Sequence, residues 1–189
     1  MGNLVLTGAT SGSSTIVPTD AVTATLTLPS ATGTLLSTAN PQSGSVIQTV
    51  SATTTTQTST TSTSYQSTGH SVTITPKFSN SKILVTAQSV GFVNMAGSSQ
   101  GGGFTIYRNN TTNLSGASSQ LGGIRANGFS SDIVSTVCMV WLDSPATTSA
   151  TTYTVYIESM AGAITAWCSS AGALINNGQA IIIAQEIAA

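Results

Sequence analysis

The chain has 189 residues, of which four are Lys or Arg, five are Asp or Glu and one is the histidine His70. Charged residues make up 5% of the chain, against about 25% in a typical soluble domain, so the acidic and basic groups that most active sites require are scarce. Ser and Thr fill about a third of the sequence. We therefore expect a polar, nearly uncharged surface with no catalytic residue, cofactor site or metal site.

The formal net charge of −1 excludes two kinds of partner. Four scattered cations (Lys77, Lys82, Arg108, Arg125) provide no basic patch of the kind that binds nucleic acid by releasing counterions. The sequence contains no window of about 18 consecutive apolar residues, so it does not predict membrane insertion. The N-terminus lacks the basic and apolar regions of a secretory signal. We expect a soluble protein without an encoded address.

The two cysteines, Cys138 and Cys168, are too few for a disulfide scaffold or a four-cysteine zinc site. The simplest interpretation is two buried thiols that act as small apolar residues. One disulfide between two late strands is an alternative. Metal binding by this pair together with His70 is a remote third interpretation. The three ligands are far apart in sequence and form no paired motif.

Residues 1–45 predict an extended arm with short strands. In residues 22–28 Val, Ala, Leu and Leu alternate with three threonines, which is the period of a half-buried strand, and Pro29 ends it. The arm has no aromatic residue and too little apolar surface for its own core, so it must attach to something else. The expected attachment contacts of the arm, to a partner or to other subunits, are Leu4, Val5, Leu6, Val22, Leu26 and Leu28.

Residues 46–64 are a Ser/Thr-rich connector by composition, since only Ala52 and Gln57 interrupt the hydroxyl residues between Ser51 and Ser64. Low complexity usually indicates a disordered linker. Threonine nevertheless has a high strand propensity, so the run can be ordered by pairing with a neighbouring strand or with another subunit.

Residues 65–189 predict an all-β domain, a jelly-roll-like antiparallel β-sandwich. The nine aromatic residues that we assign to its core all lie in this part. Short strands are expected at 72–75, 82–87, 104–108, 133–142, 153–159, 163–168 and 180–187. The glycines at 101–103 and 122–123 predict turns. Asn109, Asn110 and Asn113 open a loop near residues 109–128 that we predict to be an exposed recognition loop.

Two of these strands, at 137–142 and 181–183, are apolar at successive positions and so on both faces. A lone antiparallel sandwich should have one solvated face per sheet. We therefore expect the second faces to pack between subunits.

No catalytic motif emerges from the polar residues. His70 with Asp132 or Asp143 and a serine lacks the nucleophile-elbow sequence, so a plain histidine at a strand edge is the better interpretation. Glu158 and Glu186 are interpreted as solvent-facing or paired charges in strands, and Asp143 as the start of a turn. Gly101–Gly103 lacks the Lys and the following helix of a phosphate loop.

Residues 4–13, 24–29 and 32–35 together resemble the N-terminal segment of tail-fibre-like virion proteins of tailed bacteriophages. Local similarity continues through Ile74–Pro76, Ser81–Val85, Asp143–Pro145, Tyr153–Val155 and Glu186–Ala188. The resemblance implies a homotrimer in the virion, assembled in the host cytoplasm, with an N-terminal part bound to other virion proteins and a β-rich C-terminal domain. It also admits a host-surface glycan or receptor as a partner.

Other functions stay open at this point. At 189 residues the chain is short for a fibre, which leaves a capsid decoration (cement) protein that clamps neighbouring major capsid subunits. A carbohydrate-binding module would use Tyr107, Phe129 or Trp167 as exposed stacking platforms. A hydrolase is the weakest hypothesis, because no credible acid–base set is present.

Overall fold

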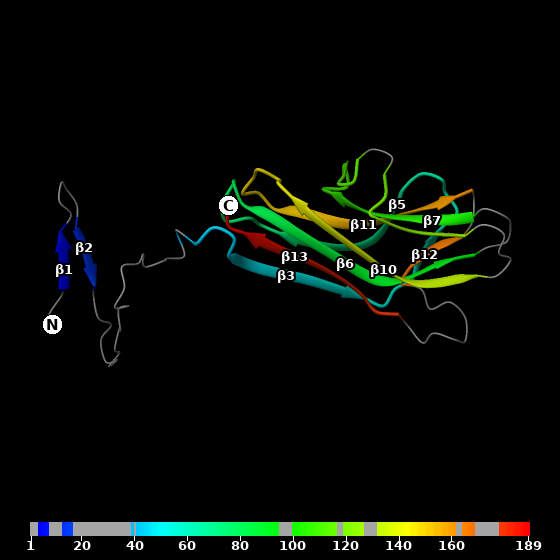
Figure 1. Cartoon of the computed structure of the whole chain (residues 1–189), viewed down its shortest axis with the longest axis horizontal. Coiled ribbons are helices and arrows are strands. Elements are labelled where there is room, and N and C mark those ends of the chain that lie inside the picture. The colour runs from blue at the N-terminus through cyan, green and yellow to red at the C-terminus, as the bar shows by residue number, and fades with distance from the viewer. Residues whose placement is uncertain are drawn as a thin grey trace. The chain divides into compact units, whose positions relative to one another are not determined.

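A computed structural model describes residues 4–7, 13–16, 39, 41–94, 100–116, 119–126, 132–161, 164–168 and 178–189 (Figure 1). These residues form strands and connections without a helix, so the prediction of an all-β protein is confirmed for them. The same residues accordingly contain no helix that could cross a membrane. The chain divides into two units, 1–35 and 36–189.

The first unit contains one antiparallel pair. Strand β1 (Leu4–Thr7) pairs with β2 (Ser13–Ile16), with Leu4 opposite Ile16 and Thr7 opposite Ser13. The predicted contact residues Leu4, Val5 and Leu6 lie in β1, whereas Val22, Leu26 and Leu28 lie outside the described residues. Attachment through these six residues stays a prediction.

The second unit consists of two antiparallel sheets that enclose one core (Figure 1). One sheet has the order β3-β13-β6-β12-β4, with β10 on the other side of β6. The other has the order β5-β11-β7-β8, with β9 also beside β7. The strands are β3 (Val46–Thr54), β4 (Thr58–Thr60), β5 (Gln66–Ile74), β6 (Lys82–Val93), β7 (Gln100–Arg108), β8 (Thr112–Asn113), β9 (Gly122–Ala126), β10 (Ile133–Asp143), β11 (Thr151–Met160), β12 (Thr165–Trp167) and β13 (Ala180–Ile187).

Alternation of apolar and polar residues accounts for the burial along these strands. In β13, Ala180, Ile182 and Ala184 are buried while the residues between them are partly exposed. Because successive side chains on a strand point to opposite faces, this pattern turns one side of β13 toward the core. The fully buried aromatic residues are Phe104, Tyr153 and Trp167, which come from both sheets.

The Ser/Thr-rich segment contributes two strands to the six-stranded sheet rather than a connector between two parts. Strand β3 pairs with β13 from Thr54 opposite Ala180 to Val46 opposite Ile187. Val50 and Ala52 pack against the core while alternate hydroxyl residues face outward. Pairing within the chain therefore orders this run, and no second subunit is needed for it.

Both predictions of glycine turns are wrong: Gly101–Gly103 lie inside β7 and are buried, and Gly122 and Gly123 begin β9. Glycine is required in β7 by close approach between the sheets. A Cβ on Gly102 would overlap the side chain of Thr165 in β12 and lie 3.0 Å from Val93 in β6. Gly102 thus allows the two sheets to pack closely, whereas Gly101 and Gly103 face the outer side of the five-stranded sheet.

We expect Gly102→Ala to destabilise the domain by about 1–3 kcal/mol, the usual cost of overpacking a core. Gly123→Ala is the matched control, because its added Cβ would meet only the amide end of the exposed Gln120 side chain. Urea unfolding of both variants measures the difference. Equal free energies of unfolding for the two variants would contradict the close packing at Gly102.

Candidate functional site

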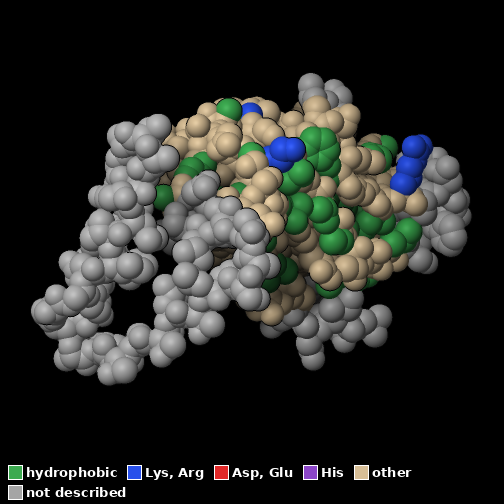
Figure 2. All heavy atoms as spheres, turned by 60° about the vertical axis from the view of Figure 1, so that its left-hand side comes forward, with side chains coloured by type: hydrophobic (Ala, Val, Ile, Leu, Met, Phe, Trp, Pro, Cys, Tyr) green, Lys and Arg blue, Asp and Glu red, His purple; other side chains and the backbone are tan. Residues whose placement is uncertain are grey.

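The solvent-facing side of the six-stranded sheet carries many apolar side chains. We define the outer apolar face as the side chains of Leu84, Val90, Phe92, Val134, Val140, Leu142, Ile181 and Ile183. Val140 lies opposite Thr86, which in turn lies opposite Ile183, and Leu142 lies opposite Leu84, so these residues share one side. Hydrophobic side chains gather on the surface seen in Figure 2 among neutral polar atoms, with few Lys or Arg and no Asp or Glu in view.

Strand β10 makes this face unusual, because it is apolar on both sides. Its residues Val137 and Met139 are buried in the core, whereas Val140 is 55% exposed and Leu142 is 48% exposed. This confirms the prediction of strands that are apolar on both faces. Within the described residues β6 is the only strand paired with β10, so β10 forms an edge of the sheet. A long apolar edge strand without Lys or Pro is a template for association.

Both cysteines are free thiols, so the disulfide alternative is wrong. Cys168 is buried as expected, and burial raises the pKa of its thiol. Cys138 is exposed, contrary to the expectation of a buried thiol, because it alternates with the inward-facing Val137 and Met139. It therefore lies on the same side of β10 as the outer apolar face. Among the described residues no group of three His, Cys, Asp or Glu lies together as metal ligands.

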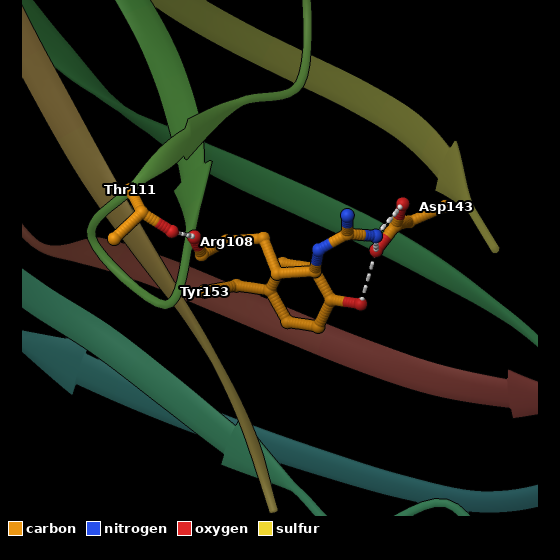
Figure 3. Close-up of polar contacts among 4 residues, drawn as sticks. All are labelled: Arg108, Thr111, Asp143 and Tyr153. Atoms are coloured by element: carbon orange, nitrogen blue, oxygen red, sulfur yellow. Dashed lines mark hydrogen bonds and ion pairs between the residues drawn. The ribbon is translucent and has the colours of Figure 1, made fainter. Parts of the chain in front are cut away.

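Figure 3 shows the one salt bridge found in the described residues. Arg108 at the end of β7 donates from one Nη atom to both oxygens of Asp143, at 2.8 and 2.9 Å. The Tyr153 hydroxyl donates to Asp143 Oδ2 at 2.7 Å, and Thr111 donates to the Arg108 carbonyl at 3.4 Å. Asp143 ends β10 as a buried residue instead of opening an exposed turn. The group ties β10 of one sheet to β7 and β11 of the other by charge-assisted hydrogen bonds.

Glu186 was expected to be a solvent-facing or paired charge, but it is fully buried and held by neutral donors. One carboxylate oxygen accepts from the backbone N–H groups of Lys77 and Phe78 at 2.8 and 3.1 Å, and the other accepts from Gln48 at 2.6 Å. Burial raises the pKa of this carboxyl, but the hydrogen bonds outweigh burial and hold it below its usual value. Glu186 thus anchors the connection between β5 and β6.

His70 lies in the edge strand β5, as the sequence predicts, but its ring is buried. Trp167 Nε1–H donates to His70 Nδ1 at 3.2 Å, and His70 Nε2 donates to the Ala52 carbonyl at 3.2 Å. This arrangement requires the neutral ring with its proton on Nε2. Burial lowers the pKa of His70 against an opposing hydrogen bond to Ala52. Neither nitrogen is left to activate a serine.

The predicted recognition loop divides into a tip and a packed part. Asn109 and Asn110 form the exposed turn between β7 and β8 with φ of 51° and 56°, conformations that asparagine tolerates. Asn109 Oδ1 also accepts from the Thr152 N–H at 2.9 Å. Asn113 lies in β8 instead, where its Oδ1 accepts from the Thr105 hydroxyl at 2.6 Å. A recognition role for these asparagines stays a prediction.

Of the three predicted stacking platforms, Trp167 is excluded because it is fully buried between the sheets. Phe129 lies outside the described residues. Tyr107 is partly exposed and stacks on Tyr156, with ring centroids 4.0 Å apart, and meets Tyr65 edge-on at 6.0 Å. Tyr65 carries no prediction from the sequence, and the prediction that Tyr156 belongs to the core is wrong, because it is partly exposed beside Tyr107. Tyr156 follows the core residue Tyr153 by three positions. Because side chains alternate along a strand, this odd spacing indicates that Tyr156 faces outward.

Comparison of the chain with protein-family models gives no match. Comparison with curated proteins gives no match either.

We expect the stability of the protein to fall between pH 7.5 and pH 5 because of His70. The unfolded ring titrates near its ordinary pKa of 6.5, and the folded ring has a lower pKa, so the unfolded chain binds more protons in this range. The contribution of His70 is therefore complete above pH 6.5 and is lost as the pH falls toward the folded pKa.

Thermal unfolding midpoints of the wild type and His70→Gln across this pH range measure the effect. The variant should show the shallower dependence on pH, since it has no histidine left. Equal slopes for the two proteins would contradict the neutral, buried ring.

Proposed function

We propose that the protein is a non-enzymatic structural component of a tailed-bacteriophage virion. It is a homotrimeric, tail-fibre-like surface appendage, assembled in the host cytoplasm. Residues 1–45 anchor it to other virion proteins, and a jelly-roll-like C-terminal domain faces the medium. The outer apolar face of the six-stranded sheet carries the proposal, and the local resemblance to tail-fibre-like proteins supports it.

The energetics of this face favour assembly. Transfer of a Leu or Val side chain out of water stabilises a protein by about 1.5–3 kcal/mol when burial is complete. Val140 and Leu142 are about half exposed, and they continue into apolar residues of β6 and β13, so a single copy leaves part of this free energy unused. Thr86 and Gln88 lie among these apolar residues. Exposed apolar residues gathered on one face often mark an interaction surface. Closed symmetry buries it without open-ended growth, and the family resemblance selects three copies.

The polar groups of the described chain support a structural role. Three of the titratable groups from which acid–base chemistry could be built, His70, Asp143 and Glu186, are buried and held by hydrogen bonds within the fold. Each joins segments far apart in the sequence. Their chemistry therefore contributes to stability.

The position of the protein in intact particles tests the virion assignment. Immunogold labelling of particles from the phage that encodes the chain should place label at the tail. Label at many positions over the capsid would overturn the tail assignment in favour of the cement function. Particles that lack the chain would overturn both.

We expect Cys138 to be protected from alkylation in the native protein, because assembly through the outer apolar face covers it. Val140→Glu places a charge in that face and should make Cys138 react at least tenfold faster, since an uncompensated charge cannot be buried cheaply. Thr73→Glu, on the exposed side of β5 in the other sheet, is the matched control and should preserve protection.

Maleimide labelling followed by peptide mapping separates Cys138 from the buried Cys168. Circular dichroism confirms that the variants are folded. Rapid alkylation of Cys138 in the wild type, at the rate seen in Val140→Glu, would contradict assembly through this face.

A further inference from the structure

The outer side of the five-stranded sheet carries a second surface, built from aromatic rings. We define the tyrosine cluster as Tyr65, Tyr107 and Tyr156, which come from the residue before β5, from β7 and from β11. Thr154 lies opposite Tyr107 and Thr105 lies opposite Tyr156, so the two stacked rings are diagonal neighbours on adjacent strands. Their planes are 27° apart. All three side chains are partly exposed.

Two polar side chains converge beside these rings. Glu158 follows Tyr156 by two residues and so projects from the same side of β11. It lies opposite Gly103 of β7, which lies opposite Gly123 of β9. A Cβ placed on Gly103 would be 2.8 Å from both Glu158 Oε1 and Gln120 Oε1. The glycines thus form a floor across which the carboxylate and the amide of Gln120 approach each other.

Hydrogen bonds hold the segment that carries Gln120 on the sheet. The Ser119 carbonyl accepts from Tyr65 Oη at 3.1 Å and from Asn113 Nδ2 at 3.0 Å. Ser115 Oγ donates to the same carbonyl. These contacts fix the amide and the rings before any ligand arrives, which lowers the entropic cost of binding.

We propose that the tyrosine cluster, Glu158 and Gln120 form a binding site for a neutral saccharide. The C–H face of a pyranose ring packs on the tyrosine rings, which supply flat apolar area with a polar edge. Adjacent sugar hydroxyls donate to the Glu158 carboxylate and exchange hydrogen bonds with the Gln120 amide. Charge-assisted bonds to the carboxylate give orientation as well as affinity.

The charges on this face select against other ligands. Glu158 repels the phosphates of nucleic acid and the carboxylates of acidic sugars. Arg125 is exposed on the same side of the sheet. It lies two residues along β9 from Gly123, opposite Gly101. The site lies on the opposite sheet from the outer apolar face, so subunit assembly leaves it accessible. The proposal adds a partner to the proposed function and does not depend on where in a particle the protein lies.

A glycan array tests the site on the purified full-length chain. The array carries neutral oligosaccharides of glucose, galactose, mannose and N-acetylglucosamine, together with sialylated and phosphorylated glycans. We expect signals confined to neutral structures. Titration calorimetry with the strongest neutral oligosaccharide should show at least tenfold weaker binding by Tyr107→Ala, Tyr156→Ala and Glu158→Gln.

Two further variants separate recognition from packing. Tyr107→Phe keeps the ring and should bind nearly as well as the wild type. Thr73→Ala, on the exposed outer side of β5 away from the cluster, is the matched control and should bind unchanged. Unfolding midpoints confirm that all variants are folded. Three results would each overturn the proposal. They are the absence of any array signal, signals confined to anionic glycans, and binding equal to that of the wild type by folded Tyr107→Ala and Tyr156→Ala, even where these variants have lower stability.

Discussion

The six-stranded sheet carries apolar side chains on both of its faces, whereas the second unit of the chain supplies only one other described sheet to cover it. The five-stranded sheet takes up the inner face, where Val137, Met139 and Ile182 are buried. The outer face, from Leu84 through Val140 to Ile183, has no cover within the described residues. This constraint connects the fold to the proposed function, because an exposed apolar patch on a protein surface commonly marks an interaction site.

Scarcity of charge shapes the rest of the molecule. The described carboxylates Asp143 and Glu186 are buried and serve as junctions, one between the two sheets and one between β13 and the connection that precedes β6. Hydroxyl residues cover the exposed side of β3 in place of charges. Glu158 remains partly exposed beside the tyrosines, where a single carboxylate has a large effect because the surroundings are nearly neutral. The proposed assembly face and the proposed recognition site thus lie on opposite sheets.

Period-two alternation was sufficient to predict most of the strands, since it reports which side of each strand is buried. The low complexity of residues 46–64 concealed β3, because composition does not reveal that Val50 and Ala52 face the core. Gly101–Gly103 was misinterpreted for a related reason: a glycine required by a neighbouring sheet has the same local sequence as a glycine in a turn. The partners of Glu186 and the convergence of Gln120 with Glu158 depend on cross-strand register between distant segments. Local sequence does not encode that register.

The central claim is that the outer apolar face is covered by other copies of the chain. Native mass spectrometry of the purified protein tests it most directly, because it counts subunits without any assumption about the particle. The account predicts a dominant species of three times the 19.0 kDa chain mass. A dominant species at the mass of one chain, persisting at the highest concentration that the protein tolerates, would contradict it.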